Sequence, residues 1–132
     1  MRKGFTLLEL LIVVVILGIL ALIAAPTLLN AADQARNGAV KANISAAASS
    51  VTSRFALNGT ETATQVATNV AASLNTNNKN PITGTGAAYS TTAGAAEGIV
   101  TLVGTDATDS IEIKGYGVGG TELITKVINA PQ

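Results

Sequence analysis

The first 29 residues restrict the fold more than any other part of the sequence, because they contain an almost unbroken apolar run. Residues 10–25 carry no charge, and with its flanks the run reaches the roughly 20 residues that span a bilayer as a helix. Arg2 and Lys3 precede the run, and basic flanks are retained on the cytoplasmic side. We therefore expect one N-terminal membrane span, with the rest of the chain outside the cytoplasm.

Glu9 is the one charged residue inside this run. A carboxylate costs about 2.5–3.5 kcal/mol at the centre of a bilayer and less near its interface, and simple anchoring needs none. A cleaved signal peptide fits poorly, because Pro26 directly follows the best small-residue exit at residues 24–25. Glu9 is therefore a candidate functional residue that requires a partner. The alternative is an incidental interfacial glutamate on an ordinary membrane anchor.

Residues 4–9 (GFTLLE), behind a short basic leader, closely resemble the processing motif of type IV prepilins, the class III signal sequence. The resemblance implies that residues 1–4 are a leader peptide and that a prepilin peptidase cuts the Gly4–Phe5 bond on the cytoplasmic face. It implies that Phe5 then becomes the new N-terminus and is N-methylated. It also implies that Glu9 balances the positive amine on Phe5 of a neighbouring subunit as a filament assembles.

Electrostatics supports this role for Glu9 independently. Cutting after Gly4 removes both basic side chains and creates an α-amine one helical turn from Glu9, on the same face. In a low-dielectric bundle an unpaired charge costs far more than a paired one. Either the chain's own amine or that of a chain offset along the axis can meet Glu9. A subunit offset that pairs each Glu9 with a Phe5 amine is therefore favoured over other offsets.

Gly18 and Pro26 are expected to weaken the helix over residues 5–29, the transmembrane and polymerisation segment. Pro26 has no N–H and its ring crowds the carbonyl of Leu22, so we expect a bend or a lost hydrogen bond there. Gly18 costs a helix about 1 kcal/mol relative to alanine. The pilin resemblance implies that residues 18–26 stretch when the subunit leaves lipid for the filament core. The alternative is that membrane helices simply tolerate both residues.

Residues 30–58 predict an amphipathic continuation of the same helix. Apolar residues recur at helical spacing while the opposite face is polar. The apolar positions are Val40, Ile44, Ala47 or Ala48, Val51 and Phe55. Asn58-Gly59 suits the end of this helix, because either residue can adopt the left-handed cap. The apolar stripe needs a cover, which residues 59–132 must supply as a small globular head.

The head is expected to contain a short helix over residues 60–74, a loop over 75–97 and a three-stranded antiparallel sheet over 98–129. Thr62 and Gln65 fit a capping box at the start of the helix. From residue 98 the hydrophobic period changes to two, which indicates strands with short connections. The third strand is expected either to be buried on both sides or to edge an interface. The predicted fold class is α+β, a long N-terminal helix with a small antiparallel meander, as the pilin resemblance also implies.

The composition argues against several classes of protein. The chain contains no His and no Cys, which removes Ser-His-Asp and Cys-His nucleophile systems and His or thiolate metal sites. No enzyme activity, cofactor or metal is expected, because the carboxylates form no acid–base motif and Asp106 with Asp109 supply too few ligands for Ca²⁺. The scattered Lys and Arg residues indicate no nucleic-acid binding. Without a disulfide, the head must hold together by packing.

These observations predict a structural subunit of a type IV pilus filament. The precursor is expected in the cytoplasmic (inner) membrane, and the mature chain in an extracellular homopolymer. The implied partners are a prepilin peptidase, a platform membrane protein and a cytoplasmic assembly ATPase. Two alternatives remain open: a pseudopilin of a type II secretion or competence system, and a bitopic membrane protein whose head binds a ligand without polymerising.

Overall fold

A computed structural model describes residues 3–57, 59–94 and 96–131. Its first element, α1 (Leu7–Leu57), is a single α-helix of 51 residues with Pro26 inside it. The predicted stop at Asn58-Gly59 falls partly outside the described residues, because Asn58 is not among them. The chain divides into two compact units, Met1–Gln34 and Ala35–Gln132.

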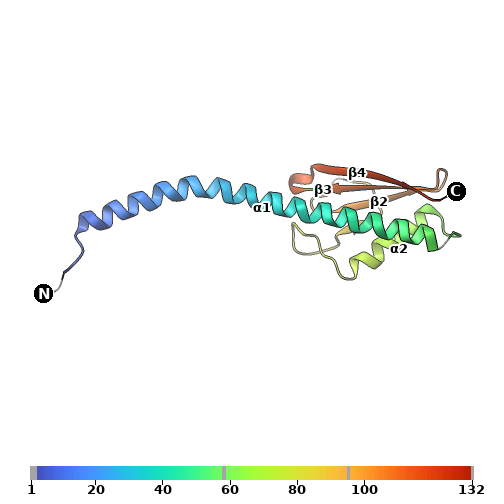
Figure 1. Cartoon of the computed structure of the whole chain (residues 1–132), viewed down its shortest axis with the longest axis horizontal. Helices are drawn as coiled ribbons and strands as arrows, with labels where there is room; N and C mark the ends of the chain where they lie inside the picture. The colour runs from blue at the N-terminus through green and yellow to red at the C-terminus, as the bar shows by residue number, and fades with distance from the viewer. Residues whose placement is uncertain (1–2, 58, 95, 132) are drawn as a thin grey trace. The chain divides into compact units, whose positions relative to one another are not determined.

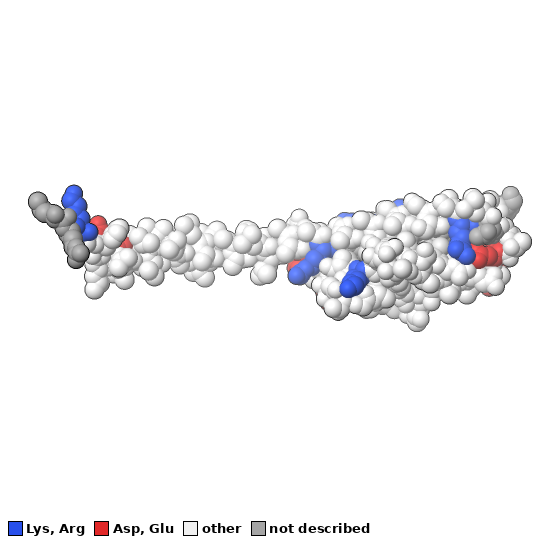
Figure 2. All heavy atoms as spheres, turned by 90° about the horizontal axis from the view of Figure 1, so that it is seen from below, with Lys and Arg blue, Asp and Glu red and all other residues white. Residues whose placement is uncertain are grey.

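The first unit leaves its apolar side chains uncovered. Every large hydrophobic side chain from Phe5 to Leu29 is at least 50% exposed. Beyond Glu9, Figure 2 shows this stretch of helix as an uncharged surface. By length and composition, α1 is able to cross a membrane. A surface of this kind requires lipid or other protein around it, because a soluble monomer rarely exposes so large an apolar area.

The second unit packs a helix and a four-stranded sheet along residues 35–57 of α1 (Figure 1). The helix is α2 (Ala63–Asn75), and the sheet has the order β1-β2-β3-β4. The strands are β1 (Tyr89–Ser90), β2 (Val100–Thr105), β3 (Ser110–Tyr116) and β4 (Glu122–Asn129), with a 3₁₀ turn η1 (Val118–Gly120) before β4. The predicted α+β class is confirmed, with a long apolar N-terminal helix followed by a small sheet.

The core of this unit lies between one face of α1, one face of α2 and the inner face of the sheet. The predicted stripe on α1 is confirmed, because Val40, Ile44, Ala47, Val51 and Phe55 are all buried. The sheet contributes alternating residues that include Leu102, Ile111 and Ile113, each fully buried. Glycines allow close approaches: a Cβ on Gly104 would stand 2.5 Å from the backbone carbon of Ala63. The head is thus held together by packing across these three elements.

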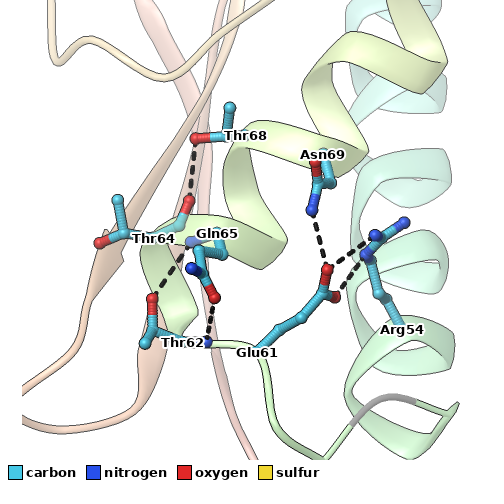
Figure 3. A network of polar contacts seen from close by, with 7 residues as sticks. All are labelled: Arg54, Glu61, Thr62, Thr64, Gln65, Thr68 and Asn69. Atoms are coloured by element: carbon cyan, nitrogen blue, oxygen red, sulfur yellow. Dashed lines mark hydrogen bonds and ion pairs between the residues drawn. The ribbon is translucent and has the colours of Figure 1, made fainter.

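Two caps hold the start of α2. The Thr62 hydroxyl accepts a hydrogen bond from Gln65 N–H, and the Gln65 side chain accepts one from Thr62 N–H, which is the capping box expected from the sequence (Figure 3). Asp106, from the β2–β3 turn, adds a second cap by accepting a hydrogen bond from Thr64 N–H at 2.7 Å. This hydrogen bond to the Thr64 backbone lowers the pKa of the Asp106 carboxyl. Asp106 is therefore part of the helix cap.

Asparagine side chains fasten the segment between α2 and β2. Asn75 accepts hydrogen bonds from Ala88 N–H and Tyr89 N–H and donates one to the Tyr89 carbonyl. Asn80, which is buried, accepts from Ile82 N–H and Thr83 N–H and donates to the Glu97 carbonyl. These amides replace the backbone hydrogen bonds that a loop lacks.

The sheet gains a fourth strand inside the segment expected to be a loop. β1 pairs with β2 in parallel, with Tyr89 opposite Val100, whereas the other pairs are antiparallel. Tyr89 is buried, and burial raises the pKa of its hydroxyl. A strand of two residues is too short to show a period of two, so the sequence pattern alone does not reveal it. β4 forms the opposite edge of the sheet and is largely exposed, so the prediction that this strand is buried on both sides is wrong.

Candidate functional site

The candidate site is the start of α1, where Thr6 and Glu9 form a reciprocal helix cap. Thr6 N–H donates to Glu9 Oε2 at 2.8 Å, and the Thr6 hydroxyl donates to the same oxygen at 3.1 Å. Glu9 N–H in turn lies 3.2 Å from Thr6 Oγ1. This is a capping box, in which the side chains of the cap residue and of the third helical residue bond each other's backbone N–H groups. The cap fixes the first helical residue at Leu7.

The predicted scissile bond lies outside the helix. Residues 3–6 have no regular secondary structure, and Gly4 and Phe5 are exposed. A Cβ added to Gly4 would have no atom within 4 Å, so the chain's own fold does not require glycine at this position. A requirement for glycine here would therefore come from an enzyme that binds the segment.

Phe5 and Glu9 lie on the same side of the chain. Together with Leu10, Ile12 and Val13 they line a shallow depression of about 340 Å³. Both hydrogen bonds to the Glu9 carboxylate reach Oε2, and Oε1 accepts none from the described residues. Within the described part of the chain, one oxygen of the carboxylate is thus hydrogen-bonded and the other is available for a further donor.

Gly18 and Pro26 lie farther along the same helix, away from Glu9. Both stand inside α1, and a Cβ on Gly18 would meet no atom within 4 Å. The helix continues past Pro26, where the carbonyl of Leu22 lacks its usual donor because proline has no N–H. The structure therefore groups Phe5 with Glu9 and leaves the two helix-weakening residues as separate positions on the same element.

Thr6 is the residue that sequence reasoning did not single out. Its signal was present, because Thr6-Leu7-Leu8-Glu9 has the S/T-x-x-E spacing of a capping box directly before an apolar helix. The same rule identified Thr62 and Gln65 in the head.

Two comparisons with known proteins give a match. Residues 1–25 match the family model described as the prokaryotic N-terminal methylation motif. The type IV narrow pilus major component PilA5 of Thermus thermophilus is 49% identical over 55 residues, which are 42% of this chain and 44% of that protein. The chain thus matches less than half the length of this relative. No solved structure gives a significant match. The predicted resemblance to type IV pilins is confirmed.

Proposed function

We propose that this prepilin-like chain is a non-enzymatic structural subunit of a type IV pilus. The observation that carries the proposal is the pairing of two features in one segment. These are an uncovered apolar helix and, at its start, a carboxylate with one oxygen still open. The name of the Thermus relative favours a pilus over a secretion or competence pseudopilus.

The precursor is held in the cytoplasmic membrane by residues 5–29. A prepilin peptidase removes residues 1–4, and Phe5 is N-methylated. The helix from Leu7 onward then exchanges lipid for the apolar helices of other copies, with work supplied by an assembly ATPase acting through a platform membrane protein. The product is an extracellular filament of this chain.

Glu9 sets the register of that filament. Glu9 lines the same depression as Phe5, where an amine from a neighbouring copy would find a carboxylate among apolar side chains. Such a charge-assisted hydrogen bond is strong in a low-dielectric environment, and offsets that leave the carboxylate unpaired are strongly disfavoured. The Thr6 cap keeps the other oxygen engaged throughout.

Mass spectrometry of the chain recovered from cells, with electron microscopy of surface filaments, tests the proposal. We expect the mature chain to lack residues 1–4 and to carry one added methyl group, and to be a component of the filaments. A Gly4→Ala chain should keep its leader and stay in the membrane with its head folded. Recovery of only intact, unmethylated monomers would instead support a bitopic anchor.

A further inference from the structure

A cleft opens between α1 and α2 within residues 35–131. Its volume is about 230 Å³. Three apolar residues line it, Leu57, Val70 and Leu74, together with three serines, Ser50, Ser53 and Ser73. No described residue hydrogen-bonds the side chains of these serines, and Leu57 is 81% exposed. The lining of the cleft thus combines apolar side chains with hydroxyl groups, and Arg54 completes it.

The charged group at this cleft is neutralised within the chain. Arg54 donates two hydrogen bonds to Glu61, from Nε to Oε2 at 2.7 Å and from Nη2 to Oε1 at 2.8 Å (Figure 3). Asn69 of α2 donates to the same carboxylate at 2.9 Å, so the fork joins the two helices. A charged partner group is therefore not needed to neutralise the cleft. An apolar side chain flanked by uncharged polar side chains suits it best.

The outer face of the edge strand β4 has this composition. Thr125, Val127 and Asn129 alternate along β4 and are all exposed. On the same face of the sheet, Glu112 and Lys114 of β3 stand directly opposite Val127 and Thr125, and they form an ion pair with each other at 2.9 Å. Among the described residues from 35 onward, Leu57 and Val127 are the large hydrophobic side chains left exposed. One borders the cleft, and the other projects from a strand at the edge of the sheet.

We propose that the β4 face centred on Val127 packs into the α1–α2 cleft of another copy of this chain. The inference rests on the proposed filament function. An open helical polymer requires heterologous contacts, in which two different surfaces of each copy complement each other. The cleft and the β4 face are candidates for two such surfaces, because each presents one of the two exposed large hydrophobic side chains of residues 35–131 among polar groups, and they lie on different elements.

Cysteine pairs test this contact, since the natural chain has no cysteine. A chain with Ser53→Cys and Val127→Cys is expressed in cells that assemble filaments, and sheared filaments are analysed on non-reducing gels after mild oxidation. We expect a ladder of disulfide-linked multimers. The matched control combines Val127→Cys with Thr68→Cys, since Figure 3 shows Thr68 on the side of α2 turned away from Arg54. The control should give several-fold less cross-linked product.

Co-expression of the two single-cysteine chains makes the test directional. Each disulfide then uses one cleft and one β4 face, so the products should stop at dimers, while either single variant alone should stay monomeric.

Filaments of the double variant without a ladder, or with no more product than the control, overturn the contact and leave the filament assignment intact. If the double variant builds no filaments, Val127→Ala replaces it: unchanged filament yield with this variant overturns the contact. A wild-type chain absent from filaments would overturn the proposed function itself.

Discussion

Glu9 combines two electrostatic tasks in one side chain. In the uncut chain its Oε2 caps the helix through the Thr6 N–H and hydroxyl groups. In the proposed filament its other oxygen meets an amine from a neighbouring copy. The intrachain hydrogen bonds reduce the cost of placing the carboxylate near lipid, because a partnered charge is cheaper to desolvate than a bare one. The residue is thus prepared for assembly before assembly begins.

Glu9→Gln separates these two tasks. Glutamine also completes a capping box, so the helix should still begin at Leu7, but the negative charge is lost. We expect filament yield to fall by roughly tenfold or more, because a neighbouring amine is left unpaired. The measurement is sheared filament mass per cell, alongside the fraction of chains that have lost residues 1–4.

Thr6→Val is the matched control, since it keeps the carboxylate and removes the hydroxyl of the cap. It should reduce yield less than Glu9→Gln does. Equal yields for Glu9→Gln and the parent would show that charge pairing does not select the subunit register.

Asn75 fastens β1 through three hydrogen bonds to backbone groups of Ala88 and Tyr89. In an Asn75→Ala chain these partly buried groups lose their partner, so the free energy of unfolding should fall by about 1–3 kcal/mol. Thermal unfolding of the full chain in detergent micelles measures this. Asn77→Ala is the control, because Asn77 is exposed. Equal melting temperatures for the two variants would contradict the role of the Asn75 amide.

Asp106 makes the stability of α2 depend on pH. The Thr64 hydrogen bond lowers the pKa of this carboxyl in the folded state, so the folded state binds protons less readily than the unfolded chain. Its stabilisation is present above the ordinary aspartate pKa of about 3.9 and is lost as the pH falls through the lower folded value. The melting temperature, measured at a series of pH values from neutral to strongly acidic, should therefore decrease more steeply for the parent chain than for Asp106→Ala.

At the scale of the elements, close packing of α2 against the sheet depends on a glycine. Gly104→Ala would place a methyl group 2.5 Å from the Ala63 backbone, which no rotamer change relieves. We expect overpacking to cost about 1–3 kcal/mol, measured by thermal unfolding. Gly38→Ala is the matched control, because a Cβ there meets nothing within 4 Å and alanine favours a helix by up to about 1 kcal/mol. A destabilising Gly38→Ala would contradict this description of α1.

The elements differ in how far the sequence predicts them. α1 and its buried stripe follow from long apolar and amphipathic patterns, and β2, β3 and β4 follow from alternation. β1 does not, since two residues show no period, and its position depends on Asn75 thirteen and fourteen residues earlier. The Asp106 cap also escapes prediction, because its partner is 42 residues away. Patterns within a short segment can be predicted from the sequence, whereas hydrogen bonds between residues far apart in the sequence become visible only once the fold is known.

For the molecule as a whole, the same distinction applies to the candidate site. Residues 4–9 and their apolar continuation identify a prepilin-like terminus directly from the sequence, and the matched methylation motif over residues 1–25 agrees. The cleft between α1 and α2 was not predicted. It is formed by residues about twenty positions apart on two helices, none of which belongs to a recognisable motif.

Hydrogen bonds from side-chain amides hold the segment between α2 and β2 in place, and the chain contains no cysteine. Its folding therefore needs neither an oxidant nor a disulfide isomerase. Such a head can mature in anoxic or sulfide-rich water as readily as in air. Dithiothreitol at millimolar concentration should accordingly leave its melting temperature unchanged. The proposed filaments should likewise persist under reducing conditions that would open a disulfide-bonded fibre.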